Sequence, residues 1–420
     1  MTSITIRPDR PAIDTPLEIR LDGLRPGTAV TVRATSGPMD SHATFEADTT
    51  GSVDLSTNTP TAGTYEGADP MGLVWSMSPI PGGTAAPSHG NLPPSTLTLT
   101  AEAEGEAGAV ATVDRLRLPD DITCQVVRER GLVATLFHPL DDGPRPGVIL
   151  LGGSEGGLHE MDAALLAAHG FSVLALAYFG TDGVPPFLVN IPLEYFGTAI
   201  DFLQAHESVA GGRIGAMSGS RGGEAALLIG SIFPAIGAVV STVGSGELTQ
   251  GIGPGSDLLE MAGTPVPSWS WRGLPLPYLR NRLTPEFRRQ IADGVPVELG
   301  RIFEPGLADP REVEACAIEV ERIRGPVLLV SAGDDRMWPS GPLSEVAARR
   351  LAAAGLAHEH LHFADAGHPI APPPFGSTTE LLSPGPGVTF AMGGTPRANA
   401  HARAEAWGRS IEFLGEALGS

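Results

Sequence analysis

Residues Ala216–Leu228, AMSGSRGGEAALL, place a turn of small residues between an apolar, strand-like run and a segment that can begin a helix. Such a strand, tight turn and helix can hold a serine at a strained position with its hydroxyl exposed, where only small neighbours fit. The usual pattern is Gly-x-Ser-x-Gly, and here Ser218 replaces the first glycine before Ser220 and Gly222. The segment predicts Ser220 as a nucleophile; the alternative is an ordinary strand-to-helix turn.

The chain around this segment alternates apolar runs with helical segments. Continuous apolar runs without polar alternation are typical of parallel strands that are covered on both faces. The five runs are Gly147–Leu151, Phe171–Ala177, Arg213–Met217, Ile236–Val240 and Pro326–Val330. Residues 119–420 are therefore predicted to form an α/β domain, with a mostly parallel sheet and helices on both faces.

Two later loops supply an acid and a base in the order that a serine nucleophile needs. The segment SAGDDRMWP (residues 331–339) directly follows a predicted strand, and FADAGHP (residues 363–369) follows another. Serine, aspartate and histidine in this chain order, each after its own strand, are typical of α/β-hydrolases. We predict His368 as the general base and Asp335 as the acid that orients it. The adjacent Asp334 is the alternative acid.

An acyl-transfer site also needs hydrogen-bond donors for the developing oxyanion. The backbone amide of Arg221, at the predicted start of the helix after the nucleophile, is one candidate. The second is expected in the glycine-rich loop Gly152–Gly157, where the amide of Ser154 is the best candidate. A phosphate cradle is the alternative for this loop, but the Gly-Lys-Ser/Thr ending of a P-loop is absent from it.

The remaining chain is predicted to form a β domain and an insertion. Residues 1–118 contain short alternating strands, such as Ala29–Ala34, that turn residues separate, and this pattern predicts a β-sandwich. A less regular stretch at about 244–324 lies between two predicted strands and is interpreted as a lid-like insertion. Its Trp269 and Trp271 are possible walls of a substrate pocket.

Composition excludes several partners. The 420 residues carry a net charge of −21 and include no lysine, so we expect no nucleic-acid partner and no binding to an anionic membrane. No apolar run is long enough for a membrane span, and a cytoplasmic location is expected. Cys124 and Cys316 have no metal-ligand or redox spacing. Alternate histidines in HEHLH (residues 358–362) could share a face, but no fourth ligand is evident, so we expect no metal or cofactor.

Several of these segments together resemble the acyl-CoA thioester hydrolase and bile acid-CoA:amino acid N-acyltransferase family. The resemblance covers nearly the whole chain. The segments are GSRGGE at 219–224, GGSEGGL at 152–158, LEYF at 193–196, DDRMW at 334–338, AGHP at 366–369 and YEGADPMGLVW at 65–75. The resemblance implies an immunoglobulin-like β-sandwich followed by an α/β-hydrolase domain.

The resemblance also implies a chemistry. Ser220 would attack an acyl thioester, carried on CoA or on the pantetheine of a carrier protein, and water or an amine would resolve the acyl-enzyme. Members dedicated to amino-acid conjugation resemble enzymes with cysteine as the nucleophile, so serine here favours hydrolysis. The alternatives are an acyltransferase or cyclase, a carboxylesterase, and a non-catalytic binding protein of the same fold. The chain ends without the peroxisomal tripeptide that animal members often carry.

Overall fold

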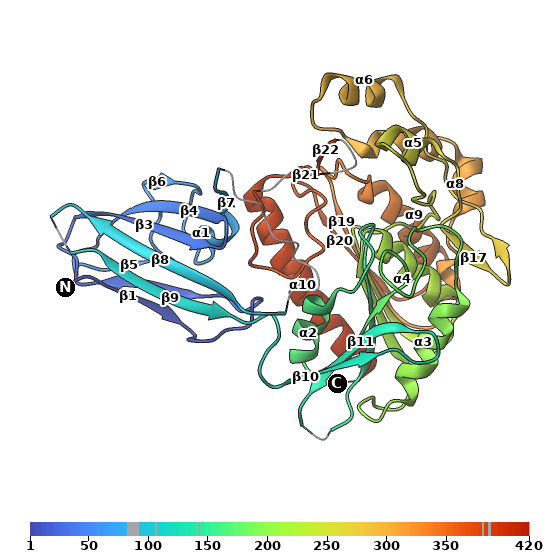
Figure 1. Ribbon diagram of the computed structural model, residues 1–420, viewed down its shortest axis with the longest axis horizontal. Helices are drawn as coiled ribbons and strands as arrows, with labels where there is room; N and C mark the ends of the chain where they lie inside the picture. The colour runs from blue at the N-terminus through green and yellow to red at the C-terminus, as the bar shows by residue number, and fades with distance from the viewer. Residues whose placement is uncertain (82–91, 106, 142, 380–381, 385–387, 420) are drawn as a thin grey trace. The chain divides into compact units, whose positions relative to one another are not determined.

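The computed structural model describes residues 1–81, 92–105, 107–141, 143–379, 382–384 and 388–419. The described residues form two compact units (Figure 1). The first contains residues up to Asp120, close to the expected boundary at 118. Two later segments, beginning at Pro373 and at Thr395, also belong to the first unit, whereas the sequence analysis placed them in the second.

The first unit contains two antiparallel sheets. Side chains alternate along its strands, so that Val30, Val32 and Ala34 are buried between exposed or half-buried neighbours. One sheet has the order β1 (Ser3–Arg7), β2 (Glu18–Asp22), β5 (Val53–Asp54). The other has the order β6 (Ala62–Gly63), β4 (Met39–Glu46), β3 (Ala29–Ser36), β8 (Ser95–Ala103), β9 (Ala109–Arg115), with β7 (Ser78–Pro79) beside β4; α1 spans Gly72–Trp75. The predicted β-sandwich is confirmed.

The second unit is built on an eight-stranded sheet. All residues of β12, β13, β16 and β19 are buried, as expected for strands with both faces covered. The order is β10 (Ile122–Val127), β11 (Val133–Pro139), β13 (Ser172–Ala177), β12 (Gly147–Leu151), β15 (Ile214–Gly219), β16 (Ile236–Thr242), β19 (Val327–Ala332), β20 (His358–Phe363). The six strands β13, β12, β15, β16, β19 and β20 pair in parallel. β11 pairs with β13 in the antiparallel direction, and β10 pairs with β11 in the same way.

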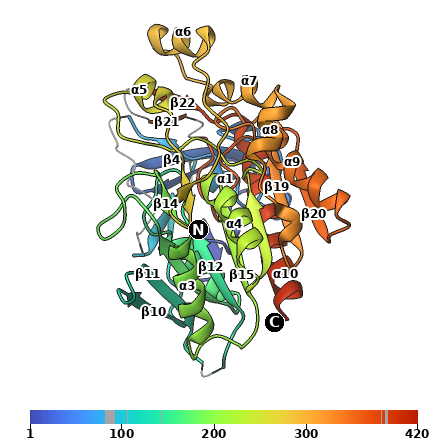
Figure 2. The same cartoon turned by 90° about the vertical axis from the view of Figure 1, so that its right-hand side faces the viewer.

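Helices connect these strands. One residue separates the end of β15 from the start of helix α4, and α3 and α4 pack in the same apolar core against the sheet (Figures 1 and 2). The connecting helices are α2 (Glu160–Ala168), α3 (Glu194–Ala205), α4 (Arg221–Ile232) and α9 (Ser340–Ala353), and α10 (Pro396–Leu418) follows the last strand, with residues from Glu405 onward in this unit. The predicted α/β-hydrolase class is therefore confirmed. In the described part of the chain, no helix has both the length and the apolar character to cross a bilayer.

The long connection between β16 and β19 forms short elements with their own apolar core. Phe287 and Trp338 are buried in this core, and Thr284 caps the helix that carries Phe287. Its elements are α5 (Leu258–Gly263), β17 (Trp269–Trp271), β18 (Leu274–Pro275), α6 (Pro285–Asp293), η1 (Leu299–Ile302), α7 (Glu304–Leu307), α8 (Pro310–Cys316) and η2 (Val320–Arg322). Figure 2 shows α5 to α8 at the end of the unit near the hairpin of β21 (Leu382–Pro384) and β22 (Thr389–Ala391). β14 (Ile191–Pro192) pairs with β17.

Candidate active site

Ser220 lies between the last residue of β15 and the first residue of α4, in a strained backbone conformation. Its φ of 54° and ψ of −126° lie in a region that residues with side chains rarely occupy. Its amide donates to the carbonyl of Thr242. Crowding explains the small neighbours, because a Cβ added at Gly222 would lie 1.9 Å from Ser218 Oγ and 2.5 Å from the carbonyl oxygen of Gly152.

Two further side chains meet the Ser220 hydroxyl in a chain of hydrogen bonds. His368 Nε2 lies 3.0 Å from Ser220 Oγ, and His368 Nδ1 lies 2.9 Å from Asp335 Oδ2. The Asp335 side chain is 1% exposed, and its other oxygen accepts from the Trp338 amide at 3.0 Å. The His368 imidazole therefore contacts the Ser220 hydroxyl through one nitrogen and a buried carboxylate through the other, and a carboxylate beside Nδ1 favours the tautomer with its proton on that nitrogen.

Asp334 points to different partners. Its oxygens lie 2.9 Å from Arg336 Nε and 2.9 Å from the Gly394 amide, and its side chain is 42% exposed. Partial burial raises the pKa of Asp334, but the hydrogen bonds from Arg336 and Gly394 outweigh it and hold the pKa below its usual range. The hydrogen bond from the Gly394 amide to Asp334 thus connects the loop after β19 to the segment at Gly394.

The glycine-rich loop after β12 lies against the start of α4, since the carbonyl of Gly152 borders Gly222. Ser154 is in this loop and is half-buried. The amide of Gly153 donates to the carboxylate of Glu155 at 3.1 Å, and the Tyr178 hydroxyl donates to the Gly152 carbonyl at 2.8 Å. Arg221 is the first residue of α4, and an amide at this position has no acceptor within its own helix.

A buried histidine that the sequence analysis missed supports this loop. His159 Nε2 lies 2.7 Å from Glu155 Oε1, and His159 Nδ1 lies 3.3 Å from Asp162 Oδ2. Burial lowers the pKa of His159, but the carboxylates of Asp162 and Glu155 outweigh it and raise the pKa to about 10. His159, the residue directly before α2, is therefore an imidazolium that contacts two carboxylates.

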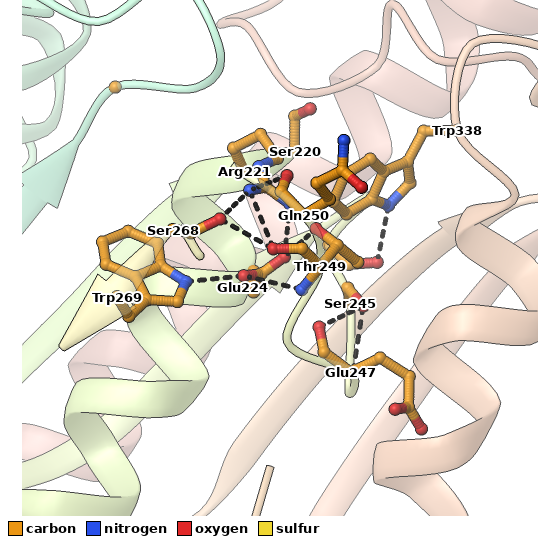
Figure 3. A network of polar contacts seen from close by, with 12 residues as sticks. Ser220, Arg221, Glu224, Ser245, Glu247, Thr249, Gln250, Ser268, Trp269 and Trp338 are labelled. Carbon is orange, nitrogen blue, oxygen red and sulfur yellow. Dashed lines mark hydrogen bonds and ion pairs between the residues drawn. The ribbon is translucent and has the colours of Figure 1, made fainter. Parts of the chain in front are cut away.

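A second missed feature is a buried carboxylate near Ser220 (Figure 3). Glu224 lies in the first turn of α4 and forms an ion pair with Arg221, with Nη1 2.8 Å from Oε2. Trp269 Nε1 also donates to Glu224, at 2.6 Å. The sequence does contain a signal for this ion pair, since Glu224 follows Arg221 by three residues at the start of a predicted helix. The signal is weak, because acidic residues are common in the first turn of a helix, where they interact favourably with the helix dipole.

The other candidates of the sequence analysis lie apart from the catalytic hydrogen bonds. Trp269 is buried in the main core, and Trp271 is half-buried and packs edge-to-face on Phe233. His360 and His362 both contact the Ser331 hydroxyl, at 2.8 and 2.9 Å. Among the residues that the structure describes, no group of three or more His, Cys, Asp or Glu side chains is arranged to hold a metal ion.

Comparison with known proteins identifies two family segments along the chain. Residues 14–129 match the acyl-CoA thioester hydrolase/BAAT N-terminal region, and residues 191–420 match the BAAT/acyl-CoA thioester hydrolase C-terminal region. The second segment alone covers more than half of the chain.

Three mammalian relatives are similar over nearly the full length. Acyl-coenzyme A thioesterase 1 of Mus musculus is 32% identical, over 97% of this chain and 94% of its own. Human acyl-coenzyme A thioesterase 2, mitochondrial, is 30% identical, over 97% of this chain and 82% of its own. The peroxisomal succinyl-coenzyme A thioesterase of Mus musculus is 30% identical, over 97% and 94%.

Proposed function

Because the chain belongs to the acyl-CoA thioester hydrolase/BAAT family, we propose that it hydrolyses acyl-CoA thioesters through an acyl-enzyme on Ser220. The observation that carries the proposal is the chain of contacts from Ser220 Oγ to His368 Nε2 and from His368 Nδ1 to Asp335, at 3.0 and 2.9 Å. A hydroxyl is a weak nucleophile until a base removes its proton, and this arrangement supplies that base.

In the first half-reaction His368 takes the Ser220 proton as Oγ attacks the thioester carbonyl. The buried Asp335 stabilises the imidazolium that forms. Negative charge develops on the carbonyl oxygen, and the backbone amides of Arg221 and Ser154 are proposed to donate to it. The tetrahedral intermediate collapses, the C–S bond breaks, and the CoA thiolate takes the proton from His368.

In the second half-reaction water replaces the thiol. His368 removes a proton from water, the resulting hydroxide attacks the acyl carbon, and Ser220 Oγ leaves and regains its proton from His368. An amine that entered instead of water would give an amide. The presence of a serine nucleophile, rather than a cysteine, supports water as the acceptor.

The first test identifies the nucleophile by covalent labelling. A fluorophosphonate probe is expected to label wild-type protein and the Ser218→Ala variant, because the Ser218 hydroxyl is buried and donates to the Leu151 carbonyl. Ser220→Ala is expected to abolish labelling. Labelling of Ser220→Ala at the wild-type rate would reject Ser220 as the nucleophile.

A substrate panel then identifies the reaction. Acyl-CoA, acyl-pantetheine and p-nitrophenyl esters are compared by release of free thiol or phenol, with and without added glycine or taurine. We expect acyl-CoA to give the highest kcat/KM and free acid to be the main product. An amide conjugate as main product, or turnover of esters alone, would contradict the proposal.

A further inference from the structure

Glu224 is a fully buried carboxylate with donors from three parts of the chain. Its residue is 0% exposed. Arg221 Nη1 donates from the same helix at 2.8 Å, Thr249 Oγ1 donates at 2.6 Å, and Trp269 Nε1 donates at 2.6 Å. Thr249 and Trp269 belong to two separate segments of the connection between β16 and β19. One carboxylate thus joins the helix that follows the nucleophile to this connection (Figure 3).

The guanidinium of Arg221 extends the same network. It is 3% exposed, and its Nη2 donates to the Gln250 carbonyl at 2.9 Å and contacts the Ser268 hydroxyl. It also lies over the ring of Trp338, 5.3 Å from the ring centroid. The Trp338 amide is the group that holds Asp335 Oδ1. Arg221 therefore contacts the insertion and the acid loop with its side chain, while its own backbone amide is a proposed donor to the oxyanion.

Stability alone does not account for such a pair. Burial raises the pKa of the Glu224 carboxyl and lowers the pKa of the Arg221 guanidinium, and the two charges oppose these shifts. A buried ion pair returns about as much free energy as its desolvation costs, so an apolar pair of similar size is often as stable. What such an ion pair adds is a defined geometry, because Arg221 Nη1 and Nη2 both have fixed acceptors and both Glu224 oxygens have fixed donors.

We propose that Glu224 is a positioning residue for the Ser220 reaction. Through Arg221 it fixes the first residue of α4, whose amide is to bind the oxyanion, and it holds Trp338 beside the acid. The inference rests on the proposed function, since it assumes Ser220 as the nucleophile. Glu224 touches none of the reacting atoms, so its effect is expected on the rate of the chemical step rather than on substrate binding.

The test compares Glu224→Gln with a matched control. The amide keeps the size of the side chain and an acceptor for Trp269, but it leaves the Arg221 charge without a counter-ion. We expect kcat for acyl-CoA and the rate of fluorophosphonate labelling to fall together, roughly 10- to 100-fold, with KM changed less than about 3-fold. Glu224→Asp, which keeps the charge, is expected to recover part of the loss.

The control is Glu247→Gln at pH 7. Glu247 is also a fully buried carboxyl, in the connection between β16 and β19 that packs on Glu224, but both of its oxygens lack a hydrogen-bond partner among the described residues. Figure 3 shows its carboxylate turned away from that of Glu224. This variant is expected to keep wild-type kcat and labelling. A loss equal to that of Glu224→Gln would mean that any buried carboxyl of this region matters, and would overturn the assignment.

A double variant keeps the inference testable if Glu224→Gln folds poorly. Arg221→Met with Glu224→Gln removes both charges, so the thermal midpoint is expected to recover while kcat stays low. Full recovery of kcat in this variant would overturn the positioning role. If Ser220→Ala still labels, the proposed function has failed; if only Ser220→Ala loses labelling and Glu224→Gln labels at the wild-type rate, the positioning role alone has failed.

Discussion

Asp334 and Asp335 are neighbours in the chain, yet of the two only the Asp335 carboxylate contacts the His368 imidazole, at 2.9 Å from Nδ1. The carboxylate of Asp334 binds Arg336 and the Gly394 amide instead. Because the loop directs these two adjacent aspartates to different partners, substitutions at the two positions can be compared directly.

Replacing each acid by its amide is expected to separate their roles. Asp335→Asn would lower kcat by about 10³- to 10⁴-fold, since the amide favours the wrong tautomer of His368 and cannot stabilise its charged form. Asp334→Asn would change kcat less than about 5-fold and lower the thermal midpoint by a few degrees. Steady-state kinetics and thermal denaturation of both variants check this. A larger kcat loss from Asp334→Asn would reverse the assignment.

Gly222 is expected to tolerate no side chain. A Cβ there would overlap Ser218 Oγ and the Gly152 carbonyl, so Gly222→Ala must displace either the elbow or the oxyanion loop. We expect labelling of Ser220 to slow by at least about 100-fold. Gly408→Ala in α10, where nothing lies within 4 Å, is the control and is expected to stabilise the protein by about 0.5–1 kcal/mol. Equal labelling rates in the two variants would disprove the crowding argument.

Glu247 predicts a pH dependence of stability. Burial first, and then the nearby Glu224 carboxylate, raise the pKa of Glu247 to about 8. The folded protein therefore keeps a proton that the unfolded chain releases near its ordinary pKa, and stability falls as the pH rises from about 5 to 8. Glu247→Gln carries no such proton, so its thermal midpoint is expected to exceed that of the wild type increasingly over this range. If the thermal midpoints of the wild type and Glu247→Gln differed by the same amount at every pH from about 5 to 8, the prediction would be contradicted.

His159 predicts a pH dependence on the alkaline side. Its raised pKa means that the folded protein holds a proton that the unfolded chain loses near pH 6.5. The stabilisation is complete below that pH and is lost as the pH approaches about 10. His159→Gln is therefore expected to be less stable than the wild type at pH 7, with a gap in urea midpoint that narrows by pH 10. A gap that stays constant would show that the imidazolium contributes nothing.

The sequence was most informative where chain order and local pattern coincide. Ser220 and Asp335 could be chosen because each follows an apolar run, and His368 because it comes after a further predicted strand, so that the three occur in a set order. The apolar runs themselves predicted the buried strands well, since strands with two covered faces leave little room for polar residues. β10, an edge strand, and its neighbour β11 were not predicted: the mixed polarity of β10 resembles a loop, whereas the first five residues of β11 are all buried.

The residues that sequence reasoning missed are buried charges. Glu224 and Glu247 are both 0% exposed, yet in sequence each is an isolated acid beside small residues, which is the usual pattern of an exposed position. Their burial depends on how the connection after β16 packs on α4, a long-range contact that local periodicity does not encode. Local pattern likewise did not show that the segments that begin at Pro373 and Thr395 fall in the first compact unit, since their contacts lie far away in the chain.

The Ser220–His368 contact joins residues that are 148 positions apart. During synthesis the chain is made from its N-terminus, so the nucleophile and its strained turn leave the ribosome long before the base does. β20, the edge strand that His368 follows, is the last strand added to the eight-stranded sheet. A translation product that stops anywhere before residue 368 therefore lacks the imidazole that contacts Ser220, so the proposed nucleophile has no partner for its proton until His368 has been made and β20 has joined the sheet.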